Sequence, residues 1–369
     1  MRQIPLSVPV IKGNEWRYVK DCLDTGWVSY VGAYVDKFEK KVSGYLGSKY
    51  AIATVNGTSA LHASLIACGV KPGDRVIVPA LTFIAPVNAV KYCGAEPVFM
   101  DCDAQTLCID AGKTAEYLAS KAGRRVKAVI PVHVFGHPAD MDLLGSSCRK
   151  RGIDIIEDAT ESLGSEYKGR KAGILGRAGC LSFNGNKIIT TGGGGMVVTD
   201  DAALAGRIKH LTTQAKKDPF EYDHDEIGFN YRLSNVQAAI GVAQMETLGK
   251  YVRIKRANAD LYRKQLSRVD EVEFLWEKPW AKSNFWFYTV KVPAADRRPL
   301  MKKLLSRGIQ VRPVWKLINT LPMYKKCVSY KVEEAVRAYN TCINLPCSVD
   351  LTPGQISFIT GEIRKYFRG

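Results

Sequence analysis

The sequence lacks the features that mark exported, membrane-spanning or metal-binding proteins. No apolar run reaches the roughly 18 residues that a membrane span requires. The first ten residues, MRQIPLSVPV, lack the basic and then apolar build of a signal peptide. The ten cysteines are scattered and form no C-x-x-C pair, so we expect reduced core residues, not disulfides or metal ligands. The sequence therefore predicts a cytoplasmic protein with no metal and no membrane contact.

The charge is unevenly distributed along the chain. The 369 residues are 46% hydrophobic and carry a net charge of +17, a length that suits two globular domains. Residues 251–369 hold 23 Lys and Arg against 10 Asp and Glu, so most of the excess lies in the last third. An excess of basic residues can bind nucleic acid, attract an anionic small substrate or simply form a solvated surface. Zinc-finger spacing, a basic helix with heptads and an aromatic RNA-binding signature are absent, and we expect no nucleic-acid partner.

Short β-branched runs alternate with helix-like segments from about residue 49. This alternation predicts an α/β fold whose parallel sheet is covered by helices on both faces, with ligands beyond the carboxyl ends of the strands. A long helical pattern from about Gln237 leads into a region with its own strands, so we expect domains 1–245 and 246–369. The clearest expected strands are 75–80, 96–101, 126–135, 153–158, 195–200 and 285–292, and the clearest helices are 58–68, 84–93 and 141–151.

Two of the expected loops carry polar residues that have more than one interpretation. Asn56-Gly57-Thr58-Ser59 is a glycine turn that opens a helix, and it could bind phosphate or simply cap that helix. Glu157 and Asp158 end an apolar strand, where a carboxylate is either a solvated strand end or the partner of a cationic ring atom in a bound ligand. His133 and His137 flank another strand end and are expected to be core or positioning residues.

A third loop combines one lysine with small and polar residues. Its sequence is Ser182-Phe183-Asn184-Gly185-Asn186-Lys187, and two threonines and four glycines follow shortly after it. Lys187 could be a Schiff-base nucleophile if burial or a neighbouring cation lowers the pKa of its amine. A phosphate loop is the competing interpretation, but the G-x-x-x-x-G-K-S/T order of a nucleotide-binding loop is absent.

These blocks together resemble the DegT/DnrJ/StrS family of sugar aminotransferases, which depend on pyridoxal phosphate (PLP). The matching segments include NGTSALHASL (56–65), PALTFIAPVNAV (79–90), EDATESLGS (157–165), LSFNGNKIITTGGGGMVVTDD (181–201) and GFNYRLSNVQAAIG (228–241). The resemblance implies the fold of aspartate aminotransferase, fold type I, with a large mixed but mostly parallel sheet and a smaller C-terminal domain. The residues of the matching segments most resemble those of the branch that makes bacillosamine- or legionaminate-type sugars.

The resemblance also implies a role for each matched residue. Lys187 is the Schiff-base lysine and Asp158 the acid that pairs with the pyridine nitrogen. Glu161 lies where many members carry Gln or His near the ring. Asn230 reaches the phosphate in the neighbouring subunit, so we expect a homodimer with shared active sites. The expected contacts of PLP are Gly57, Thr58, Ser59, Phe83, Asp158, Glu161, Ser182, Asn184, Lys187 and Asn230.

The expected substrates are L-glutamate and a nucleotide-linked 4-keto-6-deoxyhexose, which receives the amino group at C4. Aromatic and basic groups suit a nucleobase and a diphosphate, so Trp27, Arg312, Trp315 and Lys316 are expected beside the sugar nucleotide, together with Lys187. Two alternatives remain open: a PLP-dependent sugar dehydratase, in which histidine replaces the lysine, and a non-catalytic regulator. Lys187 argues against the first.

Overall fold

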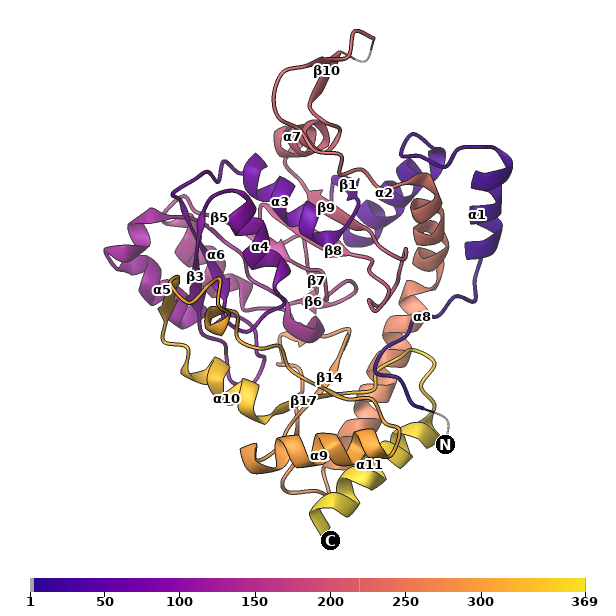
Figure 1. The fold of residues 1–369 in the computed structure, drawn as a ribbon, viewed down its shortest axis with the longest axis vertical. Coiled ribbons are helices and arrows are strands. Elements are labelled where there is room, and N and C mark those ends of the chain that lie inside the picture. The colour runs from indigo at the N-terminus through magenta and orange to yellow at the C-terminus, as the bar shows by residue number, and fades with distance from the viewer. Residues whose placement is uncertain (1–2, 219, 369) are drawn as a thin grey trace.

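The computed structural model describes residues 3–218 and 220–368, and its largest sheet has eight strands. Figure 1 shows this sheet within the fold. The strand order is β1-β9-β8-β5-β4-β2-β3-β16. Strands β8 to β16 of this order pair in parallel, whereas β9 runs antiparallel to both β1 and β8. The strands are β1 (Tyr50–Thr54), β2 (Arg75–Pro79), β3 (Glu96–Met100), β4 (Val126–Val129), β5 (Asp154–Asp158), β8 (Ala178–Ser182), β9 (Gly195–Thr199) and β16 (Val328–Tyr330). The expected mixed, mostly parallel sheet is thus confirmed.

Helices pack around this sheet, and Figure 1 shows α3 and α4 lying across it. Several begin at a short polar side chain that accepts a main-chain N–H of the first turn: Asn56 for α3, Asp110 for α5, Asp140 for α6 and Asp201 for α7. Within the described ranges, no helix is both long and apolar enough to cross a membrane. The helices are α1 (Glu15–Asp24), α2 (Ala33–Leu46), α3 (Gly57–Ala67), α4 (Ala85–Tyr92), α5 (Ala111–Ala119), α6 (Met141–Arg149) and α7 (Ala202–Thr212).

The C-terminal part has a sheet of its own, with the order β12-β14-β17-β15. Helices α9 and α11 lie beside it at the end of the molecule that holds the C-terminus (Figure 1). Its elements are β12 (Glu273–Phe274), β14 (Tyr288–Lys291), β15 (Arg312–Pro313), β17 (Cys342–Leu345), α9 (Ala294–Ser306), α10 (Glu333–Thr341) and α11 (Pro353–Arg368). Two small sheets complete the fold: β10 (Lys216–Asp218) with β11 (Asp223–His224), and β6 (Glu166–Tyr167) with β7 (Arg170–Lys171) and β13 (Ala281–Lys282).

The two parts of the chain are joined by continuous elements. Helix α8 (Asn235–Leu266) runs without interruption through residues 245 and 246, so the expected boundary lies inside a helix. Strand β16 lies beyond that boundary in sequence yet extends the edge of the large sheet beside β3. Near the N-terminus, Ile4 forms a β-bridge with Ile309. Segments on each side of the expected boundary therefore cross to the other part.

Two expected strands are shorter in the structure. The run at 126–135 forms a strand only over Val126–Val129, because a 3₁₀ turn occupies Val134–Gly136. The run at 285–292 is a strand only over Tyr288–Lys291. Phe285 has φ = 50°, a left-handed conformation that a strand cannot contain. In both runs the apolar residues of the sequence suggested an extended, buried strand. The backbone turns within each run instead.

Candidate active site

A cavity of about 530 Å³ lies where the loops of the large sheet meet β15 and its neighbours. It brings together most of the residues that the sequence predicted for the cofactor and the substrate. Other lining residues were not predicted, among them Thr160, Asn186, Trp286, Phe287 and Asn344. The predicted residues that line it are Gly57, Thr58, Phe83, Glu161, Ser182, Asn184, Lys187, Arg312, Trp315 and Lys316.

Strand direction explains why distant loops converge on this cavity. Strands β5 and β8 are parallel, and β9 is antiparallel to β8 and β1, so β1, β5 and β8 end at the same edge. Asp158 and Ser182 are the last residues of β5 and β8, and Gly57 follows β1. The glycines before β9 reach this edge from the other direction. The rule that ligands bind beyond the carboxyl ends of strands thus selected loops that meet at this cavity.

Asp158 lies buried at the end of β5, where its main chain is tied into the sheet. Its N–H donates to the Pro131 carbonyl over 2.9 Å, and its carbonyl accepts the N–H of His133 over 3.1 Å. The Asp158 Oδ1 atom accepts the main-chain N–H of Thr160 over 3.1 Å. Burial raises the pKa of the carboxyl, although Thr160 and the Lys187 charge oppose that rise. A buried carboxyl of this kind gains most from a cationic partner beside it.

Lys187 lies between an acid and an aromatic ring. Its Nζ atom is 3.9 Å from Glu161 Oε1 and 3.9 Å from the centroid of the Trp286 ring. Burial lowers the pKa of the Lys187 amine, and the negative charges of Glu161 and Asp158 oppose that shift. Burial also raises the pKa of Glu161, to about 8. The side chain of Lys187 is still 12% exposed, and the residue lines the cavity.

Glu157 does not share the position of its neighbour Asp158. It is fully buried, and its carboxylate accepts the main-chain N–H groups of Gly173, Leu175 and Gly176 over 2.5–2.8 Å. His133 Nε2 lies 2.8 Å from Glu157 Oε2, and its Nδ1 accepts the N–H of Ala139 over 3.1 Å. These partners place the ring proton on Nε2. Glu157 and His133 therefore hold a loop behind β5, which fits the expected structural role of the histidine.

His137 is also part of the core. Its Nδ1 atom lies 2.7 Å from the Pro138 carbonyl, and its Nε2 accepts the N–H of Lys278 over 3.1 Å. Burial lowers the pKa of His137 to about 4, so the ring is neutral near pH 7. These two bonds use both ring nitrogens, and the residue links the loop after β4 to the C-terminal part.

Comparisons with known proteins agree with this geometry. Residues 9–364 match the DegT/DnrJ/EryC1/StrS aminotransferase family. The chain belongs to this family. It is 39% identical to a GDP-perosamine synthase of Caulobacter vibrioides over 98% of this chain and 97% of the relative.

Solved structures of aminotransferases share the whole fold. The aminotransferase TlmJ of Streptoalloteichus hindustanus is 30% identical, with a TM-score of 0.93 and 98% coverage of both chains. PseC of Helicobacter pylori, an aminotransferase in pseudoaminic acid biosynthesis, is 25% identical, with a TM-score of 0.93 over the full length of both. The protein is thus a PLP-dependent sugar aminotransferase of fold type I.

The phosphate end of a PLP molecule fits the loops around α3. A Cβ atom on Gly57 would lie 3.1 Å from Ser182 and Thr160 side-chain carbons, and one on Gly195 would lie 2.4 Å from the main chain of Asn56. At Gly195 only glycine allows this approach, and at Gly57 a side chain would crowd the loops around the start of a helix, where an anion is favoured. The hydroxyls of Thr58 and Ser182 are suitable donors beside it.

Ser59 contributes differently from its neighbours. Its main-chain N–H donates to Asn56 Oδ1 over 2.8 Å, so the Asn56 side chain caps the helix. The residue is buried in α3 and does not line the cavity. Asn56 and Ser59 therefore form the cap of the helix, whereas Gly57 and Thr58 line the cavity, where phosphate binding stays a prediction.

Two predicted residues lie away from the cavity of their own chain. Trp27 is 58% exposed in the segment after α1, where its carbonyl accepts Asn235 Nδ2 over 2.6 Å. Asn230 is exposed and forms a β-bridge with Thr213 at the base of the β10-β11 hairpin. Figure 1 shows this hairpin projecting from the body of the aminotransferase. Neither residue lines the cavity, so any contact of Asn230 with a cofactor would have to be made in another subunit.

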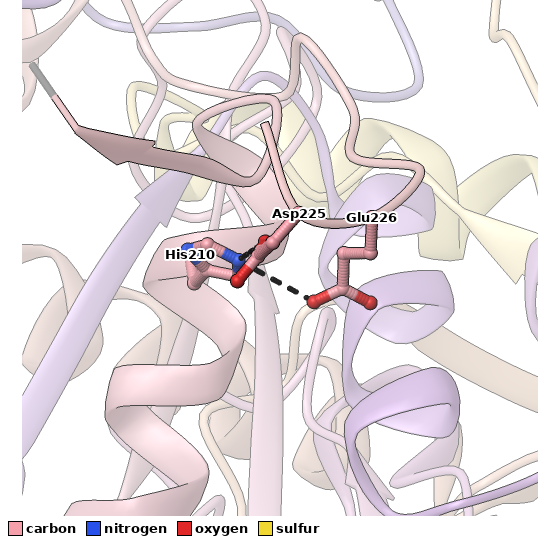
Figure 2. Close-up of side chains that lie close together, drawn as sticks. All are labelled: His210, Asp225 and Glu226. Carbon is pink, nitrogen blue, oxygen red and sulfur yellow. Dashed lines mark hydrogen bonds and ion pairs between the residues drawn. The ribbon is translucent and has the colours of Figure 1, made fainter. Parts of the chain in front are cut away.

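The base of the hairpin is anchored by a cluster of charged side chains on its surface (Figure 2). His210 Nε2, at the end of α7, lies 2.7 Å from Asp225 Oδ1 and 3.4 Å from Glu226 Oε1. Arg207 pairs with the same Glu226 carboxylate. Since an arginine already neutralises one of the acids, the cluster fits a clamp between α7 and the hairpin better than a metal site.

Trp286 is a lining residue beside Lys187 that the sequence interpretation did not single out. It lies in the aromatic run at 285–292, which was assigned to a strand of the smaller domain. Its ring nevertheless covers the Lys187 amine, and it forms a wall with Trp315 and Phe135, whose ring centroids are 4.6 Å apart. The run of four aromatic residues was a signal of burial, but nothing in its spacing indicated which loop it would meet.

Proposed function

We propose that this aminotransferase moves the amino group of L-glutamate to the C4 keto carbon of a nucleotide-linked 4-keto-6-deoxyhexose. The observation that carries the proposal is the position of Lys187 and Asp158 at one edge of the sheet, with Lys187 opening into a cavity of about 530 Å³. Perosamine is linked to GDP in the name of the Caulobacter relative, so a GDP-linked sugar is the first substrate to test. The 4-amino sugar produced would serve surface glycan synthesis, including O-antigen and lipopolysaccharide.

PLP, when bound, supplies an electron sink for the negative charge that forms at the Cα atom of the amino donor. Asp158 would pair with the pyridine nitrogen, which stays protonated beside a carboxylate. Lys187 would hold the cofactor and then move a proton between the donor Cα and the cofactor C4′ atom. The lowered pKa of its amine fits that role, because a neutral amine can accept the proton.

The rim of the cavity is proposed to bind the sugar nucleotide. We define the rim as Arg312, Trp315 and Lys316, which lie in or just after β15. Arg312 and Lys316 are exposed, and both line the same cavity as Gly57 and Thr58. Two exposed cations suit a diphosphate, and the half-buried indole of Trp315 suits a base or a sugar ring.

The direct test is a panel of keto-sugar nucleotides assayed with glutamate. We expect amination of a 4-keto-6-deoxyhexose linked to GDP, with the new amine at C4 identified by NMR of the product. Amination at C3, or of a sugar without a nucleotide, would contradict the proposed substrate. Loss of water from the sugar without gain of nitrogen would instead favour the dehydratase alternative.

A second part of the proposal is a homodimer in which Asn230 completes the partner's site. Equal mixing of inactive Lys187→Ala and Asn230→Ala subunits would give half mixed dimers, each with one intact site. We therefore expect about a quarter of the wild-type activity if subunits exchange at random. Subunit exchange is verified by mass spectrometry of the mixed dimer. No recovered activity despite exchange would contradict a shared site.

A further inference from the structure

Trp286 contacts the Lys187 loop through both of its chemical features. Its indole Nε1–H donates to the carbonyl of Asn186, the residue before Lys187, over 2.7 Å. Its ring centroid lies 3.9 Å from Lys187 Nζ. The indole is almost fully buried, with 3% of the residue exposed. One side chain therefore touches both the main chain and the amine of the lysine that is proposed to hold the cofactor.

The main chain of Trp286 is linked through Asn284 to the loop that carries Glu161. Its N–H donates to Asn284 Oδ1 over 2.8 Å. Asn284 is fully buried, and its Nδ2 donates to the carbonyls of Glu161 and Leu163 over 2.9 and 3.0 Å. Thus Asn284 links Trp286 to the loop after β5, while the indole links it to the loop after β8. The two loops that carry Glu161 and Lys187 are joined through one tryptophan.

We infer that Trp286 is a positioning residue that holds Lys187 ready to react when its amine is not bonded to the cofactor. The inference rests on the proposed role of Lys187. A lysine side chain has four rotatable bonds, and fixing it in one conformation removes several rotamers. The ring attracts the amine when it is protonated and limits its movement when it is neutral. The bond to Asn186 fixes the start of the side chain, and the ring fixes its end.

The test follows how fast Lys187 of cofactor-free protein becomes covalently linked to added PLP. The linkage changes the absorbance of PLP and is followed by stopped flow. It requires neither glutamate nor a sugar. Trp286→Phe retains a ring but loses the N–H donor, and Trp286→Leu loses both. Trp280→Phe is the matched control, because Trp280 packs on Tyr167 and His137 and does not line the cavity.

We expect the linkage rate to fall about tenfold in Trp286→Phe, the effect of one lost hydrogen bond, and about a hundredfold in Trp286→Leu. Trp280→Phe should stay within about twofold of the wild type, as for a change away from the reacting groups. In steady-state assays of Trp286→Phe, kcat should fall while KM for the sugar nucleotide stays unchanged. Circular dichroism and Tm establish that each variant is folded.

The possible outcomes separate this inference from the proposed function. If Trp286→Phe and Trp286→Leu link PLP as fast as the wild type, Trp286 only fills space and the inference is overturned alone. A lower Tm with an unchanged linkage rate has the same meaning. If the wild type links PLP through a lysine other than Lys187, the proposed function is overturned together with the inference. Should Trp286→Leu fail to fold, Trp286→Phe still decides the question.

Discussion

The floor and the rim of the cavity are built in opposite ways. We define the floor as Glu161 and Lys187, which line the cavity, together with Asp158, which ends β5 and is buried without lining the cavity itself. All three residues are largely covered. The rim residues Arg312 and Lys316 are exposed and lie in or just after a two-residue strand. Burial shifts the pKa values of all three floor residues. We therefore expect changes in the floor to alter kcat and the response to pH. Changes in the rim should alter KM for the sugar nucleotide and its response to salt.

The largest expected effect is on the floor, at Lys187. Lys187→Ala removes the only amine among the lining residues that lies next to both Glu161 and Trp286. Turnover should be lost, because the variant has no group that can move the proton at the donor Cα. PLP should still bind non-covalently through the residues proposed for its phosphate, Gly57, Thr58 and Ser182, as measured by equilibrium dialysis. A Lys187→Ala enzyme with substantial turnover would show that the floor has another base.

Asp158→Asn is expected to have the next largest effect. The amide keeps the shape of the side chain but cannot stabilise a protonated pyridine nitrogen. Removal of the charge should cost several kcal/mol of activation energy, where each tenfold loss of kcat corresponds to about 1.4 kcal/mol. The measurement is kcat for each half-reaction under saturating substrate. A kcat within a few-fold of the wild type would make Asp158 a structural residue only.

The rim should respond in KM and not in kcat. We expect Arg312→Gln or Lys316→Gln to raise KM for the sugar nucleotide about tenfold, the effect of losing one charged hydrogen bond. The glutamate half-reaction should remain nearly unchanged. Substrate capture should also weaken as salt rises, because the Debye length shrinks from about 10 Å at 0.1 M to about 3 Å at 1 M. Equal damage to both half-reactions would instead assign these residues to the cofactor or the fold.

The smallest effect is expected from pH on the stability of the cofactor-free protein. Because burial raises the pKa of Glu161 to about 8, the folded state binds its proton more tightly than the unfolded state, where the pKa is 4.5. The stability that this proton confers is present below pH 4.5 and is lost as pH rises toward 8. The Glu161→Gln side chain stays neutral and should avoid that loss. The free energy of unfolding of this variant should therefore rise relative to that of the wild type by about 1–3 kcal/mol between pH 5 and 8.

Calorimetry at several pH values checks this expectation. The Tm difference between Glu161→Gln and the wild type should grow steadily from pH 5 to pH 8. Exposed Glu221 provides the control, since Glu221→Gln should show no such trend. A difference that is independent of pH would show that Glu161 is ionised in the folded protein throughout this range.

The floor was predictable because topology alone gathers the ends of parallel strands. Gly57, Asp158 and Lys187 each follow a run of apolar residues, and their loops had to meet at one edge of the sheet. Trp286 was not predictable in this way. Its contact with Asn186 joins residues 100 positions apart, and it depends on a left-handed turn at Phe285 that broke the expected strand.

The resemblance to known sequences supplied roles that strand topology does not supply. It placed Asn230 at the site of a neighbouring subunit, and Asn230 lies beside Thr213, away from the cavity of its own chain. The chemistry of aromatic side chains placed Trp27 beside the sugar nucleotide, yet Trp27 lies beside Asn235 and does not line the cavity. The chain alone does not form those contacts. The sequence therefore predicted the part of the site that one sheet edge organises, and left open what other segments or subunits add.

Borohydride reduction of the PLP-loaded protein shows most directly whether Lys187 holds the cofactor. Reduction makes the bond between lysine and cofactor permanent, and peptide mass spectrometry then locates it. Lys255 is a useful comparison, because it is also buried and has a pKa lowered by burial, but its amine donates to the Cys347 carbonyl over 2.5 Å. We predict a cofactor adduct on the peptide that contains Lys187 and none on that of Lys255. An adduct on Lys255 or any other lysine, with Lys187 unmodified, would contradict the account.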